Sequence, residues 1–281
     1  MTQDIALFQK ETGEILKTIG IPPCPSILTK LLAEMRADEA DFRRIQGLIQ
    51  GDVGLAAGML KTVNSPFYGL QSKATSIQQA LHLLGSRNVV QLATGLLLNQ
   101  AFSAAKNPAI TRFLGTSGEV ALMTAHIARG LRICDRDEAY TFGLFRDCGV
   151  LVLMEKFKDY PKTLTLASVS TASPSTQVEE QHHNTHHGVI GHALAESWYL
   201  TPELCSAVRW HHDYDALQNG SVDLSPKSRK LIALALAADL MNSVEQGNPV
   251  CLEWDKGEAF VYATLGVPPE QLHELTKWPG R

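Results

Sequence analysis

The hydrophobic positions of this 281-residue chain recur mainly at helical spacing. In residues 76–85, SIQQALHLLG, the apolar side chains fall at positions i, i+3, i+4 and i+7, the spacing of one buried helix face. Ser76 precedes this pattern as a helix N-cap, and Gly85 follows it as a stop signal. The stretch therefore predicts an amphipathic helix that packs one face against a core.

Other segments carry the same helical signals. The apolar spacing repeats in residues 86–102, SRNVVQLATGLLLNQAF, again after a leading serine. Thr201, Pro202 and Glu203 supply the cap, the first-position proline and the early acid of a further helix. Alternating strand patterns joined by Asn-Gly or Asp-Gly turns are absent. We therefore predict an all-α fold, a multi-helix bundle.

Polar and turn-forming segments divide this bundle. Residues 64–76 form a turn-rich connection with two aromatic residues, and residues 105–108 mark a seam after which new helices begin. We expect an N-terminal helical part over residues 1–107. A second helical part over residues 108–281 would end in a C-terminal helical extension.

The most polar segment, residues 167–187, predicts an exposed loop because it is rich in serine and threonine. Within it, Glu179, Glu180, His182 and His183 are expected to form a solvated surface.

Composition and charge narrow the functional classes. The chain is 44% hydrophobic and 19% charged, as in ordinary soluble proteins, and its net charge is −4 with a pI of about 6.2. A protein that binds nucleic acid through phosphate contacts needs a basic face, so we expect no nucleic-acid partner. Five cysteines without a CxxC pair indicate neither a disulfide framework nor a thiolate zinc site, and fit a reducing compartment.

Targeting signals are not apparent. The first residues, MTQDIALFQKETGE, carry acids where a signal peptide would carry lysines and an apolar run. The longest apolar segment, residues 231–241, is too short to cross a bilayer and contains Asp239. We expect a cytoplasmic protein with no membrane association.

Candidate chemistry begins at residues 140–154, YTFGLFRDCGVLVLM, where Arg146 and Asp147 interrupt what is predicted to be an apolar helix. Further groups that can bind metals lie downstream in sequence. They are His186 and His187 at the start of a predicted helix, His211, His212 and Asp213 at the end of another, and Asp239. Imidazole nitrogen and carboxylate oxygen are the ligands of hydrolytic zinc, manganese or iron centres.

The same aspartates and histidines could instead have purely structural roles. A buried aspartate commonly bonds a helix N-terminus or a neighbouring arginine. Histidines at a helix end commonly bond the terminal carbonyl groups.

Three stretches of the chain resemble the HDOD (HD-related output domain) family. They are residues 21–95, which contain NSPFYG and SIQQALHLLG in tandem, residues 139–153, and residues 186–212. The likeness spans roughly residues 15–240. HDOD domains resemble degenerate HD and HD-GYP phosphohydrolases, in which a His-Asp pair and further histidines and aspartates bind metals.

The resemblance assigns roles to individual positions. Arg146 and Asp147 stand where the enzymes have their His-Asp pair, and the enzymes' first histidine falls near Thr116 or Ser117. The matching residues that are retained, and that form the candidate metal ligands, are Asp147, His187, His211, His212 and Asp239.

Arg146 opposes a metal in this comparison, because guanidinium has no free lone pair and keeps its proton. We expect Arg146 to replace the charge of the metal and to pair with Asp147 or Asp239. Arg146 and Thr116 would block the former site, so we expect no catalytic residue and no cofactor.

The resemblance leads to two hypotheses about the function. The first is a non-catalytic bacterial signal-transduction module, which acts through a protein partner in trans or a small nucleotide-like ligand. Asn64, Phe67 and Tyr68 in NSPFYG are candidates for its contact surface. The alternative is a residual phosphohydrolase acting on a nucleotide or cyclic dinucleotide with manganese, iron, zinc or magnesium. The retained histidines and aspartates favour it. Arg146, Thr116 and Val150 oppose it, and Val150 stands where the enzymes have a lysine.

Overall fold

The fold is described from a computed structural model, which covers residues 19–36, 41–65, 68–70, 72–103, 107–171, 173–248 and 251–275. These residues form helices and no strand, as the hydrophobic spacing predicts. The helices are α2 (Ser26–Arg36), α3 (Phe42–Gln50), α4 (Val53–Val63), α5 (Ile77–Leu84), α6 (Ser86–Ser103), α7 (Pro108–Leu131), α8 (Arg136–Phe145), α9 (Cys148–Lys156), α10 (Tyr160–Val169), α11 (Ser175–His183), α12 (His187–Ser197), α13 (Pro202–Trp210), α14 (Tyr214–Gln218), α15 (Pro226–Glu245), α16 (Leu252–Leu265) and α17 (Pro269–Leu275).

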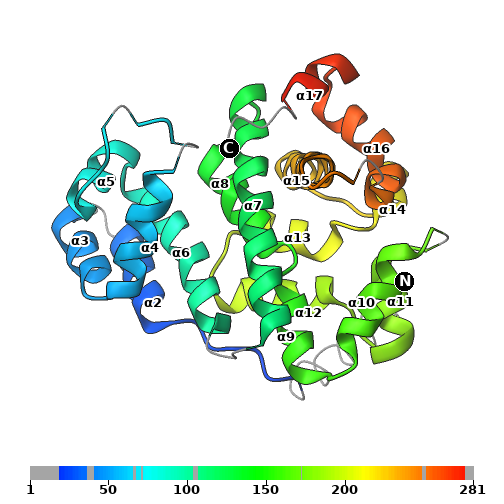
Figure 1. Ribbon diagram of the computed structural model, residues 1–281, viewed down its shortest axis with the longest axis horizontal. Helices are drawn as coiled ribbons and strands as arrows, with labels where there is room; N and C mark the ends of the chain where they lie inside the picture. The colour runs from blue at the N-terminus through cyan, green and yellow to red at the C-terminus, as the bar shows by residue number, and fades with distance from the viewer. Residues whose placement is uncertain are drawn as a thin grey trace.

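Figure 1 shows the helices in two groups, with α2 to α5 at one end and α7 to α17 forming the larger body. Helix α6 joins them, since it packs on α2 and α4 and also on α8. The predicted seam falls between α6 and α7, although residues 104–106 lie outside the described residues. The division into parts 1–107 and 108–281 remains a prediction.

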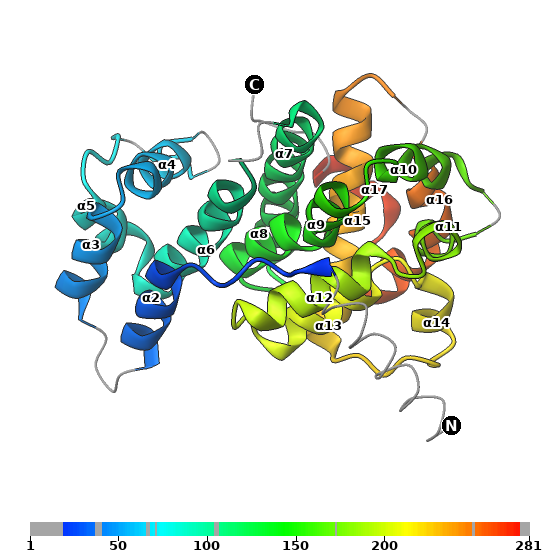
Figure 2. The ribbon, with the colours of Figure 1, turned by 90° about the horizontal axis from the view of Figure 1, so that it is seen from below.

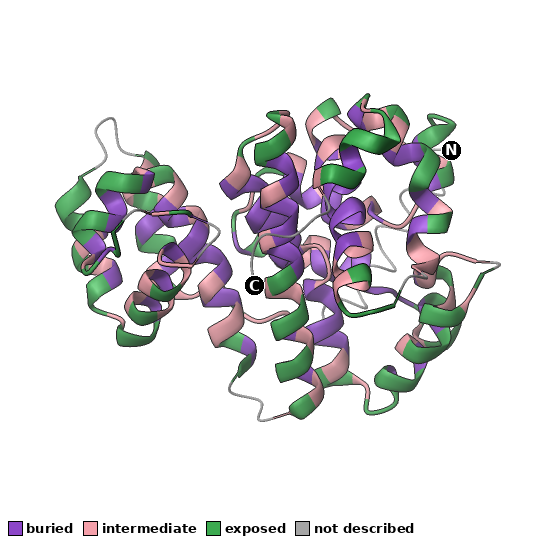
Figure 3. Cartoon of the chain, turned by 45° about the horizontal axis from the view of Figure 1, so that its top comes forward, coloured by how far each residue is buried: buried purple, intermediate pink, exposed green. Residues whose placement is uncertain are grey.

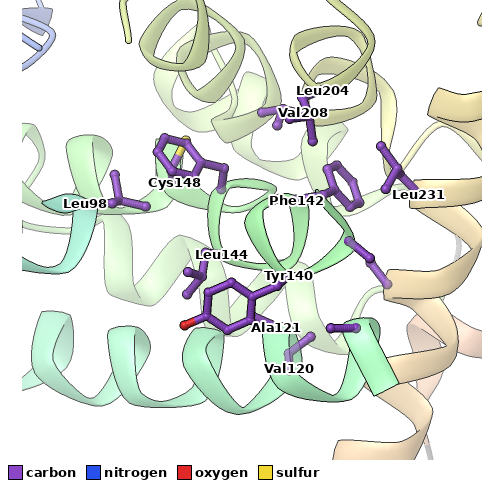
Figure 4. Close-up of a cluster of buried hydrophobic side chains, with 14 of the residues drawn as sticks. Leu98, Val120, Ala121, Tyr140, Phe142, Leu144, Cys148, Leu204, Val208 and Leu231 are labelled. Carbon is purple, nitrogen blue, oxygen red and sulfur yellow. The ribbon is translucent and has the colours of Figure 1, made fainter. Parts of the chain in front are cut away.

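Helix α8 lies at the centre of the larger body. Every residue from Asp137 to Phe145 is buried, because α6, α7, α13 and α15 pack around the helix. In Figure 4, Phe142 lies near Leu231 on one side of α8, while Tyr140 lies beside Ala121 on another. The buried residues concentrate in this central region, and the outer helix faces are exposed (Figure 3).

The predicted helix signals have the expected local roles. Ser76 Oγ accepts a hydrogen bond from the backbone N–H of Gln79, and Gly85 ends α5 with a φ of 80°. Thr201 accepts from the N–H of Leu204, with Pro202 as the first residue of α13.

The prediction of one apolar helix through Arg146 and Asp147 is wrong. Helix α8 ends at Phe145 and α9 begins at Cys148, so the charged pair lies at the junction between two helices. Asp147, the residue preceding α9, has a φ of −103° and a ψ of 15°, outside the helical range. The apolar pattern continues across this break because both helices are buried on most sides, so periodicity alone cannot reveal it.

The prediction of an exposed loop over residues 167–187 is also wrong. Helix α10 extends to Val169, and α11 occupies much of the remainder. Thr176 and Glu179 are buried, while Glu180 and His182 are exposed as expected. The polar composition of this segment does not reveal helix α11, whose buried face carries Glu179.

Among the described residues, no helix combines the length and the apolar character that a membrane crossing requires.

Candidate functional site

The candidate site lies where the first turns of α9 and α12 approach each other closely. A Cβ atom on Gly149 would lie 2.0 Å from the carbonyl oxygen of His187 and 2.7 Å from the backbone nitrogen of Gly191. Only a residue without a side chain allows α9 and α12 to come this close. The approach places Asp147, just before α9, beside His187, the first residue of α12. Figure 2 shows α8, α9, α12, α13 and α15 gathered in this region.

Three histidine side chains converge on one oxygen atom of Asp147. Its Oδ1 lies 3.0 Å from Nε2 of His211, 3.5 Å from Nε2 of His187 and 4.0 Å from Nε2 of His212. The Nε2 atoms of His187 and His211 are 3.3 Å apart. Each of the four residues offers a ligand atom, and these atoms all lie within 4.8 Å of one another. The structure thus brings together residues from α12, the end of α13 and the α8–α9 junction.

The other ring nitrogen of each histidine is already bonded. Nδ1 of His187 lies 2.7 Å from Glu179 Oε1, and Nδ1 of His211 lies 2.8 Å from the carbonyl oxygen of Val208. Nδ1 of His212 contacts Glu253 Oε1. A carboxylate or carbonyl acceptor on Nδ1 orients the ring so that Nε2 faces inward, which is the outer-shell arrangement of histidine metal ligands.

Glu179 and Glu253 belong to the site, although the sequence patterns do not indicate either residue as a site residue. Glu179 was predicted to be solvated, but its side chain is fully buried and also accepts a 2.7 Å hydrogen bond from the backbone N–H of His187. It therefore caps α12 while it orients the first residue of that helix. Glu253 lies in the first turn of α16 and was not singled out. Neither acid has a local sequence signal, because Glu253 lies close to Asp255, Lys256 and Glu258 and Glu179 lies in a polar stretch.

Arg146 occupies the other half of the site. Its Nε lies 2.9 Å from Asp147 Oδ2, while Nη1 and Nη2 each donate a 2.6 Å hydrogen bond to an oxygen of Asp239. Nη1 also lies 3.3 Å from the carbonyl oxygen of Ala235. The fork of the guanidinium engages the carboxylate of Asp239 through both oxygens, the strongest arrangement for this pair of groups. The expected pairing of Arg146 is therefore observed, and with both aspartates.

Burial and neighbouring charges shift the pKa values of Asp147, Asp239 and His212. Burial raises the pKa of Asp147, but the guanidinium of Arg146 outweighs burial and holds it well below its usual range. Burial raises the pKa of Asp239, and the bonds from Arg146 oppose this rise. Burial lowers the pKa of His212, yet Glu253 raises it to about 9. Asp147 is thus an anion at neutral pH, held between Arg146 and a protonated His212.

The ring of His211 faces Asp147 through its Nε2 atom. Burial and the neighbouring His212 lower its pKa to about 4, so its ring is neutral at neutral pH. A neutral imidazole donates through one nitrogen only. With Nδ1 donating to the Val208 carbonyl group, Nε2 presents a lone pair 3.0 Å from the anionic Asp147 Oδ1. Two acceptors that face each other are unfavourable, and a cation between them would relieve the repulsion.

The geometry of the cluster fits one metal ion. Ligands at about 2.0–2.1 Å from a tetrahedral zinc lie roughly 3.3–3.4 Å apart. The separations of 3.0, 3.3 and 3.5 Å among Asp147, His187 and His211 are close to that spacing, and His212 lies slightly farther out. Asp239 faces Arg146 instead, so the predicted set of five ligands divides into four facing the cluster and one held by the arginine.

The remaining predicted residues lie elsewhere. Thr116 is exposed on α7, and its hydroxyl donates to the carbonyl of Arg112, so among the described residues no hydrogen bond joins it to the cluster. Tyr68 is buried and donates a 3.1 Å hydrogen bond to Asp137, which is contrary to a place on a contact surface. Asn64 closes its own connection through hydrogen bonds to the backbone of Ala74. Phe67 lies outside the described residues.

The amino-acid sequence is similar to one protein family and to one curated protein. The family model of the HDOD domain matches residues 21–214. An uncharacterized protein of Treponema pallidum is 24% identical over 216 residues, which are 73% of this chain but 41% of that longer protein.

Solved structures share the fold. An HDOD domain protein of unknown function from Geobacter sulfurreducens aligns with a TM-score of 0.70 at 20% identity, over 94% of this chain and 90% of that one. A protein from Shewanella amazonensis, named as a candidate phosphohydrolase, gives 0.70 at 19% identity over 94% of both chains. A Marinobacter aquaeolei protein, named as a candidate signal transduction protein, gives 0.60 at 23% identity over 93% and 57%. At these identities the likeness establishes the fold.

Proposed function

The chain belongs to the HDOD family, and from that premise we propose that it is a signalling module that acts by binding a partner or a small ligand, without phosphohydrolase activity. The observation that carries this proposal is the position of Arg146. Its guanidinium takes both oxygens of Asp239 and one oxygen of Asp147, the two carboxylates that correspond to metal ligands in HD enzymes. A fixed cation there leaves no room for a metal bound by both aspartates.

Two further observations support the proposal. The enzymes' first metal-binding histidine falls near Thr116 or Ser117, and the hydroxyls of both residues donate to carbonyl groups of their own helix. One solved relative is named as a candidate signal transduction protein, and its fold is shared over most of this chain.

A metal-dependent phosphohydrolase is the second candidate, and the three-histidine cluster favours it. His187, His211 and Asp147, together with His212 once it has lost its proton, would hold one divalent ion, which would supply Lewis acidity toward a phosphoryl oxygen. Glu179 and Glu253 would orient two of those rings. In this candidate Arg146 would hold Asp147 in place and contribute positive charge beside the ion.

Metal analysis and a hydrolysis assay separate the two candidates. The metal content of the purified protein is measured, and bis(p-nitrophenyl) phosphate and a cyclic dinucleotide are then tested with added manganese or zinc. We expect hydrolysis no faster than the metal-containing buffer, whether or not an ion is bound. Hydrolysis that saturates with metal, disappears in Asp147→Asn and persists in the exposed control Asp215→Asn would establish the enzyme instead.

A second variant tests the role of Arg146 directly. Arg146→His restores a His-Asp pair and releases Asp239 from the guanidinium. We expect this variant to bind more divalent metal than the wild type in equilibrium dialysis. Equal metal binding by both proteins would show that Arg146 does not stand in for a metal.

A further inference from the structure

Helices α10 and α11 form a hairpin at the edge of the larger body, as Figures 1 and 2 both show. The two helices contact each other more extensively than either contacts the neighbouring helices α9, α12 and α16. The hydroxyl oxygen of Thr163 on α10 lies 2.8 Å from Nε2 of His183 on α11, and the His183 ring packs on the rings of Phe157 and Tyr160. The α10–α11 hairpin is therefore one coherent unit.

The face that this hairpin turns toward the body carries few apolar side chains. Tyr160, the first residue of α10, belongs to the buried core, and half-buried Leu164 packs against that core. Helix α11 supplies none of the core residues in the described chain, and its buried side chains are Thr176 and Glu179. Burial of apolar surface is the main favourable term in packing, so polar contacts carry a large share of this attachment.

Polar contacts tie the hairpin to the body at two places. On α11, Glu179 accepts a 2.7 Å hydrogen bond from the backbone N–H of His187, and its other oxygen lies 2.7 Å from Nδ1 of the same residue. At the turn between the helices, Nζ of Lys256 on α16 donates a 3.3 Å hydrogen bond to the carbonyl oxygen of Ser173. Water can replace these partners when the hairpin moves away, so separation has a modest cost.

A cavity of about 280 Å³ lies between the turn of the hairpin and the body. Ser173 and Pro174 line it from the hairpin, and His212 lines it from the end of α13. His212 belongs to the histidine cluster, and its side chain is 14% exposed, whereas that of His187 is 3% exposed. The cavity therefore reaches the cluster at His212, while His187 stays covered beside Glu179.

We propose that the α10–α11 hairpin is a lid on the histidine cluster, with Glu179 as its latch and Lys256 as the tie at its turn. When the lid lifts, Glu179 leaves His187, and the cavity beside His212 extends to the His187 ring. The polar character of residues 167–187 suits this task, because a segment that separates from the body then exposes few apolar groups to water. The inference goes beyond the proposed function, since a regulatory ligand of the cluster and a phosphodiester substrate would both need this route.

The backbone N–H of His187 reports the latch directly. His187 is the first residue of α12, so its N–H has no carbonyl partner within the helix and is bonded to Glu179 instead. The N–H of Leu194 lies inside the same helix and is bonded within it. Amide hydrogen exchange, followed by NMR on the full chain and corrected for intrinsic rates, therefore separates lifting of the lid from unfolding of α12.

We expect the N–H of His187 to be protected, yet to exchange at least about 100-fold faster than that of Leu194. Equal rates would overturn the proposal, because α12 would then have to unfold before the latch could break. Absence of protection at His187 would equally overturn it, because the latch would not be formed in solution.

Lys256→Met tests whether the hairpin moves as one unit. Lys256 bonds Ser173 and Glu253, and in the described residues it has no bond to His187. Loss of the tie should speed exchange at His187 about fivefold, the change expected for one hydrogen bond, and leave Leu194 unchanged. Glu253→Gln is the matched control, because it removes the charge that pairs with Lys256 and keeps the tie to Ser173. An equal rise in both variants, or no rise in Lys256→Met, would refute the role of the tie.

Access to the cluster has its own readout. Diethyl pyrocarbonate acylates accessible imidazole rings, and mass spectrometry measures the rate at each histidine. His82 on α5 is exposed and serves as the internal reference. The ring of His187 should react more slowly than that of His82 in the wild type, and Lys256→Met should raise its relative rate about fivefold, as for the amide. An unchanged ratio would refute the access role.

Circular dichroism verifies that each variant is folded, and the comparison of His187 with Leu194 in the wild type decides the matter if a variant is not. Neither assay measures hydrolysis. Phosphodiesterase activity would therefore refute the proposed function and leave the result on the lid standing.

Discussion

Arg146→Ala is the most direct perturbation of the candidate site, because it removes one side chain that holds two carboxylates. The guanidinium donates bonds of 2.6, 2.6 and 2.9 Å to Asp239 and Asp147, and its own side chain is 13% exposed. Removing one partner of a buried ion pair costs about 3–5 kcal/mol, since the remaining charge is left unpaired. The carboxylates of Asp147 and Asp239 are 20% and 21% exposed, so water partly compensates. We therefore expect the lower end, about 3 kcal/mol.

Equilibrium unfolding in urea measures this loss. A chain of this size has an m-value near the upper end of the usual range of about 1–3 kcal/mol/M, so the midpoint should fall by about 1 M. Arg44→Ala is the matched control, because Arg44 pairs with Glu34 at 3.4 Å with its side chain 71% exposed. That exposed pair should contribute less than about 1 kcal/mol. A loss below about 1 kcal/mol for Arg146→Ala would refute the reasoning that the two carboxylates depend on this arginine.

Three further changes test the framework around the site. Burial raises the pKa of Glu179, but His187 lowers this pKa from 4.5 to about 2. The contribution of Glu179 to stability is therefore present above pH 4.5 and is lost as the pH falls through about 2. Glu179→Gln should flatten that decline in acid unfolding curves, and an unchanged curve would contradict the assignment. Gly149→Ala should cost about 3 kcal/mol in urea unfolding because its Cβ meets backbone atoms, whereas Gly115→Ala, with no atom within 4 Å of the new Cβ, should not destabilise. Tyr68→Phe should cost about 1–2 kcal/mol by leaving Oδ1 of buried Asp137 without that donor, and no measurable loss would argue against the bond.

Local signals predicted the helices well. Ser76 and Thr201 act through atoms within three residues, so their capping roles are visible in a short window of sequence. The break after Phe145 has a different origin. It accompanies the contact between Gly149 and the backbone at His187, 38 positions away in sequence, and no local pattern encodes such an approach.

The sequence predicts the residues that face one another in the candidate site, but not the acids that orient them. The family resemblance aligned Asp147, His187 and His211 with metal-binding positions, and the structure brings these three together. Glu179 and Glu253 come from helices outside the motif, and their importance depends on which side of each helix faces the cluster. The tertiary packing determines that orientation.

The guanidinium at Arg146 differs from a metal ion in one consequential way: it is part of the polypeptide. A bound ion is removed by chelators, competes with other cations according to intrinsic affinity, and requires deprotonated ligands. A tethered cation is delivered at translation in a one-to-one ratio and keeps its charge through the physiological pH range. The charge that joins Asp147 to Asp239 at the junction of α8, α9 and α15 is therefore supplied by the chain itself and not by the trace-element supply.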